Sequence, residues 1–246
     1  MLDMPQRAQA SQLTFHATLI DANGKTENSW NLWVYPKELL AESSHKIRAS
    51  GFDALRKIYS WALEPTARPT LTDTDLLITT VVSPDIIDYL KAGGRVILVE
   101  PEPAFTVEKT NFRLSSWDGG GPSGTILDSK HAALRAVPSD GWCDLQFYPL
   151  IQGSKTVLLD ALPVKVRPLV RCIDRPTRLA NRAYLFEATV GRGKLLVSGF
   201  NFARAIDSKD PAGIFVFDQL VRYTLGPDFS PEASLPEEAL KRKATK

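Results

Sequence analysis

The fold class is predicted from residues 76–98, which read LLITTVVSPDIIDYLKAGGRVIL. Residues 76–82 form an almost continuous run of apolar and β-branched side chains, which is typical of a strand covered on both faces. The Ser-Pro-Asp sequence at 83–85 predicts a helix start, because Ser accepts from free amides, Pro fits the first turn and Asp favours the positive dipole end. The Gly pair at 93–94 ends that helix, and residues 95–99 form the next strand. Strand, helix and strand in this order predict a right-handed βαβ unit and a sheet that is at least partly parallel.

The segments that follow extend this pattern. Strands are predicted at residues 155–159, 168–173, 184–190 and 194–198, and a long amphipathic helix is predicted at residues 211–225. We therefore predict an α/β domain over residues 37–228, a flavodoxin-like three-layer sandwich with a mostly parallel sheet. The polar, Pro-rich residues 229–246 are predicted to form a solvated C-terminal tail.

The first 36 residues have a different period. Apolar side chains occupy every second position in residues 13–19 and again in residues 30–34, which is the period of a half-buried strand. Asn23-Gly24 supplies a tight turn between them, and Pro36 ends the second strand. Residues 1–36 are thus predicted to contain a β-hairpin rich in aromatic residues. Because an isolated hairpin is marginal in water, it packs on the following domain or belongs to a β-sandwich whose other strands are missing from this sequence.

Composition excludes several classes of function. The 246 residues are 43% hydrophobic and 24% charged, with 30 Lys+Arg against 28 Asp+Glu, as in an ordinary globular protein. A formal charge of +2 provides no electrostatic footprint for nucleic acid or for an anionic membrane, so we expect neither partner. No apolar run reaches the ~18 residues of a membrane span. The first seven residues contain no apolar core of a secretion signal, which makes a cytoplasmic location the default expectation.

Cysteine and histidine are too sparse for a metalloenzyme. The chain has two cysteines, Cys143 and Cys172, and three histidines far apart in sequence, so we expect no metal and no cofactor. Aspartates flank Cys143 on both sides of its loop and would raise its pKa, which favours a small buried thiol over a nucleophile. The glycines at 119–121 lack the Lys-Ser/Thr ending of a phosphate loop.

Two residues are candidates for a site at the strand ends. Glu100 directly follows the strand at 95–99, and ligand sites in open α/β sheets lie beyond the carboxyl ends of strands. His131 lies in a loop and is a candidate general base, although the chain has no Gly-x-Ser-x-Gly elbow; a structural hydrogen bond is the alternative. Glu187, within a predicted strand, is interpreted as a buried ion-pair partner. A hydrolase that uses Glu100 or His131 is therefore one hypothesis for the function.

Aromatic residues in the middle segment provide a second hypothesis. Trp117 and Trp142 lie there with Asp144 and Gln146 close in sequence. Flat rings beside carboxylate and amide groups suit a sugar, whose C–H faces stack while its hydroxyls form hydrogen bonds. The alternative is that the rings cover the edge of the sheet. A saccharide is thus a candidate ligand.

The segments also resemble a known family. Residues 28–36, NSWNLWVYP, resemble the strand that closes a β-sandwich in proteins of glycoside hydrolase family 2, the β-galactosidase-like enzymes. Those proteins often carry a C-terminal domain similar to class I glutamine amidotransferases, and four further segments are similar to that domain: residues 85–98, 124–134, 160–170 and 185–199. The resemblance implies that residues 1–36 are the remnant of a β-sandwich and that residues 37–228 are an amidotransferase-like α/β domain.

The chain departs from the family where chemistry would occur. An active amidotransferase places a nucleophilic Cys just after a strand, whereas Glu100-Pro101 follows the strand at 96–99, and the late segment 199–202 contains no His. The family's catalytic barrel, which needs ~250 residues, is absent from this sequence. The resemblance therefore implies a non-catalytic accessory module or fragment of a glycoside hydrolase. Its expected partners are catalytic or β-sandwich domains, or a second copy bound through the hairpin, and relatives in that family are often exported.

Overall fold

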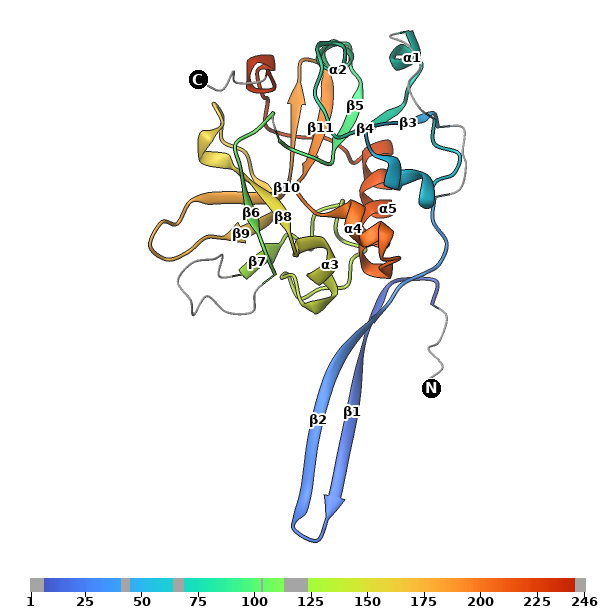
Figure 1. Ribbon diagram of the computed structural model, residues 1–246, viewed down its shortest axis with the longest axis vertical. Coiled ribbons are helices and arrows are strands. Elements are labelled where there is room, and N and C mark those ends of the chain that lie inside the picture. The colour runs from blue at the N-terminus through green and yellow to red at the C-terminus, as the bar shows by residue number, and fades with distance from the viewer. Residues whose placement is uncertain (1–6, 41–44, 64–68, 103, 113–123, 242–246) are drawn as a thin grey trace.

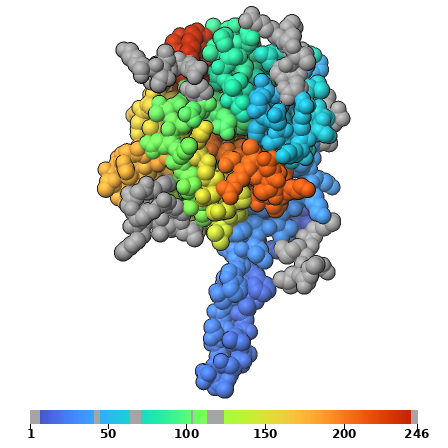
Figure 2. Space-filling model, viewed as in Figure 1, coloured from blue at the N-terminus to red at the C-terminus, as the bar shows by residue number. Residues whose placement is uncertain are grey.

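The computed structural model describes residues 7–40, 45–63, 69–102, 104–112 and 124–241, which form a body and a projecting arm (Figure 1). The arm is a two-stranded antiparallel sheet of β1 (Ser11–Asp21) and β2 (Gly24–Val34). Eleven residues per strand at ~3.3 Å each make it about 36 Å long. The space-filling view shows that most of its length stands clear of the body (Figure 2).

The body is built on a single large sheet. Counted over the described residues, this sheet has nine strands. In chain order they are β3 (Ile47–Ser50), β4 (Leu76–Thr79), β5 (Arg95–Leu98), β6 (Val107–Thr110), β7 (Gly124–Leu127), β8 (Ser154–Leu158), β9 (Pro168–Ile173), β10 (Asn181–Val190) and β11 (Gly193–Ser198). The main path runs β3-β4-β5-β11-β10-β8-β6, and β9 and β7 branch from β10.

Helices are few and mostly short. The α-helices are α1 (Pro69–Thr72), α2 (Pro84–Lys91), α3 (Tyr148–Ile151), α4 (Phe202–Asp207) and α5 (Pro211–Leu225). Short 3-10 turns are η1 (Asp53–Lys57), η2 (Leu145–Phe147), η3 (Leu159–Ala161) and η4 (Glu237–Ala239). In the part of the chain that the structure describes, no helix combines the length and the apolar character needed to cross a bilayer.

The predicted βαβ unit is confirmed. β4 and β5 are parallel neighbours, and α2 connects them. The Ser83 hydroxyl accepts a hydrogen bond from the amide of Ile86, as an N-cap does, and Pro84 occupies the first turn. Local sequence signals were sufficient in this segment because the cap, the buried stripe and the Gly stop all indicate the same helix.

The predicted fold class is wrong. Within the described residues, three strand pairings of the large sheet are parallel, namely β3–β4, β4–β5 and β5–β11. The other five are antiparallel. The chain is mostly β with a mixed sheet, and residues 37–228 are not an α/β flavodoxin-like or class I glutamine amidotransferase-like three-layer sandwich with a mostly parallel sheet. The reason is that β9, β10 and β11 follow one another through short loops, which produce antiparallel pairs, whereas parallel pairs need crossover helices.

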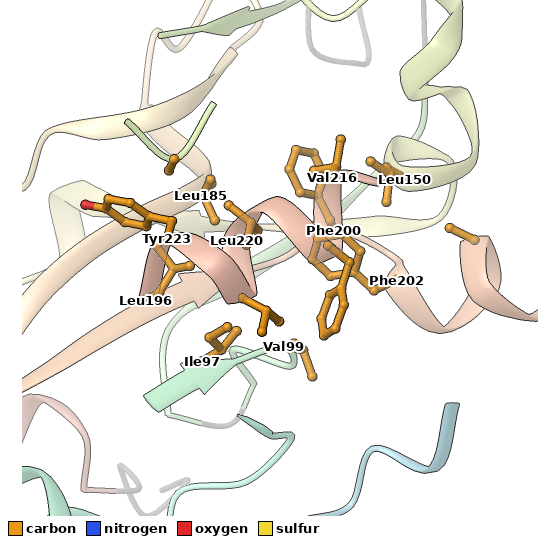
Figure 3. Packing of buried hydrophobic residues seen from close by; sticks show 14 of the residues in the cluster. Ile97, Val99, Leu150, Leu185, Leu196, Phe200, Phe202, Val216, Leu220 and Tyr223 are labelled. Atoms are coloured by element: carbon orange, nitrogen blue, oxygen red, sulfur yellow. The ribbon is translucent and has the colours of Figure 1, made fainter. Parts of the chain in front are cut away.

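Two hydrophobic clusters lie on opposite faces of the sheet. In the larger cluster, α5 packs on the central strands, and Figure 3 draws Leu220 of this helix together with Leu196 of β11 and Ile97 of β5 as members of that cluster. Phe200 and Phe202, which follow β11, extend the same cluster. On the other face, α2 provides the buried residues Ile86, Ile87, Tyr89 and Leu90. These clusters make the body a rigid support for the surfaces described below.

The chain after Asp228 differs from the predicted solvated tail. Phe229, Leu235 and Leu240 are buried. The amide of Leu235 donates to the carbonyl of Thr189 at 2.9 Å, so this segment lies along β10. Residues 229–241 are therefore part of the body, because three apolar side chains spaced among polar ones are enough to bind the segment to the sheet.

Candidate functional site

The arm has one apolar face. Directly paired residues of an antiparallel ribbon point to the same side, so the register places Leu13 with Leu32, and Phe15 with Trp30, on one face. Ala17 and Leu19 continue this face toward the tip. The rings of Phe15 and Trp30 have centroids 5.8 Å apart, yet Trp30 remains 47% exposed and Leu19 65% exposed. The pair of aromatic rings therefore lies on an open surface.

The opposite face of the arm is polar along its middle, although Trp33 lies on it near the base and Ile20 near the tip. The Thr14 hydroxyl donates to the side-chain oxygen of Asn31 at 3.4 Å, and the Thr18 hydroxyl donates to a carboxylate oxygen of Glu27 at 3.3 Å. Such cross-strand pairs stabilise a ribbon whose polar face is in water. These polar side chains are solvated without cost, whereas the apolar side chains on the other face would gain from contact with a partner.

The two chain segments at the base of the arm are both attached to the body. Ala10 before β1 and Tyr35 after β2 pack against the larger core cluster. The Tyr35 ring lies 5.2 Å from that of Phe215 on α5, and its hydroxyl donates to Oε1 of Gln146. Burial, together with the charge of Asp210, raises the pKa of Tyr35, so the hydroxyl stays protonated as a donor. The arm is thus a firmly mounted projection.

The predicted sugar-contact residues are divided between different roles. Gln146 is buried, and its Nε2 donates to the carbonyl of Pro138 at 2.7 Å. Asp144 is the N-cap of η2, where Oδ1 accepts from the amide of Leu145 at 2.6 Å. Trp142 is 57% exposed. Trp117 lies outside the described residues. The structure therefore uses Gln146 and Asp144 to hold the loop that presents Trp142.

Trp142 belongs to a flat outer surface of the sheet. The residue forms an antiparallel bridge with Ile126 of β7, and Ile126 pairs with Arg171 of β9. Bridged residues point to the same side, and all three side chains are exposed. We name Trp142, Ile126 and Arg171 the outer row. Sequence reasoning missed Arg171, although the alternation of strand 168–173 places it opposite the buried Val170 and Cys172.

Glu100 and His131 do not form one site. Glu100 is an ion-pair partner of Lys155, whose Nζ lies 3.2 Å away and also contacts Glu102 at 3.0 Å. His131 instead faces Glu187, with 3.7 Å between Nε2 and Oε1. Glu187, which the sequence led us to interpret as a buried ion-pair partner, thus has this imidazole as a neighbour. The sequence placed both residues in one candidate site at the strand ends, whereas the fold gives them different neighbours.

Glu187 also accepts a hydrogen bond from the Tyr223 hydroxyl at 2.7 Å. Burial and this carboxylate raise the pKa of Tyr223, so the phenol remains a donor. The His131 ring lies edge-on to the Tyr223 ring at 5.4 Å, and its Nδ1 accepts from the amide of Ala133 at 3.3 Å. Contacts to the Tyr223 side chain thus bring His131 and Glu187 into one polar cluster beside α5.

A cleft lies elsewhere on the body. It has a volume of about 460 Å³ and lies against one face of α2. Asp85, Asp88, Tyr89 and Ala92, which follow one another at helical spacing, provide that side of its lining. Those predicted site residues that the structure describes do not line it.

The cysteines and charged groups complete the chemical inventory. Cys143 and Cys172 are buried and unpaired, and burial raises the pKa of both thiols. Asp174 binds Arg178 and Arg182 in a network close to β6. Over the described ranges, no cluster of three or more His, Cys, Asp or Glu side chains is arranged to hold a metal ion.

Comparison with known proteins gives one family match. A family model described as a domain of unknown function (DUF8487) matches residues 77–245. A search among curated proteins finds no match.

Solved structures show a distant structural similarity to β-galactosidases. The β-galactosidase from Bacillus circulans sp. alkalophilus matches with a TM-score of 0.40 and 11% identity, covering 74% of this chain and 31% of that chain. The cold-adapted β-galactosidase from Rahnella sp. R3 matches with a TM-score of 0.36 and 10% identity, covering 75% and 32%. The chain thus spans about a third of the length of these enzymes.

Proposed function

The chain belongs to the DUF8487 family of domains of unknown function, and from that premise we propose that it is a non-catalytic accessory module of a glycoside hydrolase family 2-like, carbohydrate-active protein. Its role is to attach through the arm to a β-sandwich domain of that protein. The observation that carries this proposal is the firmly mounted arm with one uncovered apolar face.

The pattern of the arm supports a β-sheet as the partner. A strand pair with one apolar and one polar face is typical of the outer sheet of a sandwich, which packs its apolar face on a second sheet about 10 Å away. Between Leu13 and Leu19, and between Thr26 and Leu32, the apolar face contains no charged side chain. A partner that covers it is therefore apolar and uncharged at the contact.

The size of the face favours a partner within the same protein or assembly. Two strands about 36 Å long and ~5 Å apart offer roughly 350 Å². A stable interface between separate chains buries ~800 Å² on each partner. The arm alone therefore supports only weak pairing between two free copies, whereas a linked domain at high effective concentration needs less area.

The test uses the natural gene product, isolated intact, and compares two double variants. Phe15→Ser with Trp30→Ser removes the aromatic pair, and Thr14→Ala with Asn31→Ala makes a matched change on the polar face. We expect the first variant to accelerate limited proteolysis between the arm and the body at least about tenfold, because an uncovered arm opens locally more often. The polar-face variant leaves the rate close to that of the wild type.

Two results overturn the proposal. Equal proteolysis of both variants shows that the apolar face is not covered. The second result is isolation of the 246-residue chain as a stable monomer with no β-sandwich protein attached and with Trp30 fully accessible to acrylamide. It would show that no partner covers the arm.

The His131–Glu187 pair favours a second candidate function, a small hydrolase. Its test is turnover of a panel of nitrophenyl glycosides and esters by the purified chain. If a substrate is hydrolysed, Glu187→Gln and His131→Ala abolish the activity, whereas Glu100→Gln leaves it unchanged. Absence of turnover over the whole panel eliminates this candidate.

A further inference from the structure

The outer row is held rigidly in place. The amide of Leu127 donates to the carbonyl of Gly141 at 2.8 Å, and the amide of Cys143 donates to the carbonyl of Thr125 at 3.1 Å. Gly141 has φ +86, a conformation that glycine adopts without strain, and this turn directs Trp142 outward. Trp142 therefore adds one bridged residue alongside β7, and these hydrogen bonds set the position of its backbone on the sheet.

Alternation in this part of the sheet separates core from surface. Cys143, Leu127 and Cys172 point inward and belong to the larger hydrophobic cluster. Trp142, Ile126 and Arg171 point outward, and Ile126 is 46% exposed. An exposed Trp beside an exposed Ile adds nothing to the hydrophobic core. Exposed apolar surface of this kind is typical of a site that binds another molecule.

The Arg171 guanidinium is available for a ligand. Among the described residues, none forms a hydrogen bond or an ion pair with it. Neighbouring strands lie ~4.8 Å apart, so Trp142 and Arg171, which are separated by Ile126, are about 10 Å apart across the sheet. One surface thus combines a flat aromatic ring, an apolar spacer and a planar cation that no described residue pairs with.

We propose that the outer row binds an acidic oligosaccharide, one that contains uronic acid units. One sugar ring stacks on Trp142, and the carboxylate of a neighbouring unit binds the Arg171 guanidinium. Stacking satisfies the C–H face of a sugar, and a guanidinium binds a carboxylate through two parallel hydrogen bonds. Asp144, two residues from Trp142, keeps one carboxylate oxygen for a sugar hydroxyl, since the other accepts from Leu145.

This site consists of other residues than the docking face of the arm. The outer row lies on β7 and β9 in the body, whereas the docking face lies on β1 and β2. The proposal therefore goes beyond the accessory role and assigns the module a ligand class. Failure of either one leaves the other standing, since different residues carry them.

The test is a titration of the intact chain with trigalacturonic acid and, in parallel, with the neutral trisaccharide of galactose. Binding is followed by calorimetry and by tryptophan fluorescence at low and high salt. We expect the acidic sugar to bind at least about tenfold more tightly at low salt, because the charge-assisted hydrogen bonds to Arg171 are absent from the neutral complex.

Four variants assign the contacts. Trp142→Ala abolishes binding of both sugars, and Trp142→Phe retains part of it. Arg171→Gln lowers affinity for the acidic sugar by about tenfold and leaves that for the neutral sugar unchanged. Trp30→Ala on the arm and Arg135→Gln are matched controls and change neither affinity. Circular dichroism of each variant verifies the fold.

Several outcomes overturn the proposal. They are binding of neither sugar, equal affinity for both sugars, an unchanged affinity in Arg171→Gln, and an equal loss in the Arg135→Gln control. The last result would identify nonspecific attraction of an anion rather than a site.

Discussion

The hydroxyl of Tyr35, at the foot of the arm, donates a hydrogen bond to the side-chain oxygen of Gln146, in the turn that follows Trp142. Gln146 in turn donates from Nε2 to the carbonyl of Pro138 at 2.7 Å. The base of the arm and the loop that presents the outer row are therefore connected through one amide side chain. A residue that sequence analysis assigned to a ligand serves to join two parts of the fold.

Replacing Tyr35 by Phe tests this connection. The substitution keeps the ring against Phe215 but leaves Oε1 of Gln146 without its donor, so we expect a loss of about 1–2 kcal/mol in the free energy of unfolding. Urea titration followed by circular dichroism measures it. Tyr148→Phe is a matched control, since Tyr148 is largely exposed, and it changes stability by less than ~0.5 kcal/mol. Equal effects of the two variants would contradict the connection.

Asp218 holds the segment that leads from the arm into the body. Its Oδ1 accepts from the amide of Leu40 at 2.7 Å and from the Tyr59 hydroxyl, and the residue is 1% exposed. Asp218→Ala leaves these donors buried without an acceptor, and we expect it to cost about 3 kcal/mol in chemical denaturation. The exposed Asp207 pairs with Lys57, and Asp207→Ala is the control, with less than ~1 kcal/mol. A small effect at Asp218 would show that water replaces the lost acceptor.

Acid is expected to weaken the fold partly through Asp174. Hydrogen bonds from Arg178, followed by those from the amide of Ala180 and from Arg182, hold the pKa of Asp174 well below its usual value. A folded-state pKa below the unfolded value of about 3.9 stabilises the fold at higher pH, and this contribution declines as pH falls below that value. We expect Asp174→Asn to be less stable at pH 7 and to lose less further stability between pH 5 and pH 2. Urea unfolding at several pH values measures both, with the exposed Asp140→Asn as control, and parallel curves for Asp174→Asn and the wild type would contradict the prediction.

Both thiols are expected to be unreactive in the folded chain. Burial raises the pKa of Cys143 well above its usual value and also raises that of Cys172. Because the thiolate is the reactive form, iodoacetamide at pH 8 leaves the native protein unmodified and adds two groups in urea. Mass spectrometry counts the adducts. Rapid modification of native Cys143 would instead identify it as a candidate nucleophile.

Part of the fold was predictable because the signals are local. The helix at 84–91 is defined by its own cap, its buried stripe and its Gly stop, and the strands on either side are buried on both faces. The direction of neighbouring strands has no such local signal, because β10 would have the same apolar pattern with parallel or with antiparallel neighbours. The predicted fold class was therefore wrong because β10 pairs antiparallel with β8 and β9.

The candidate sites show the same division. The sequence drew attention to Trp142 because Asp144 and Gln146 lie close to it, a combination that suits a sugar, but Arg171 lies 29 positions further along and has no local signature. His131 and Glu187 were considered separately, and only the packing of α5 and β10 brings them together with Tyr223. Side chains from distant segments become neighbours through topology, which no spacing in the chain encodes.

The sequence by itself determined the elements that depend on neighbouring residues: the hairpin with its alternating faces and Asn-Gly turn, and the capped βαβ unit. Tertiary structure alone decided the mixed pairing of the sheet, the burial of residues 229–241, the mounting of the arm through Tyr35 and the assembly of the outer row. The physical reason is range. Helix caps, turns and strand alternation act over a few residues, whereas strand order and side-chain neighbours follow from burying one common core, in which distant segments compete for the same apolar surface.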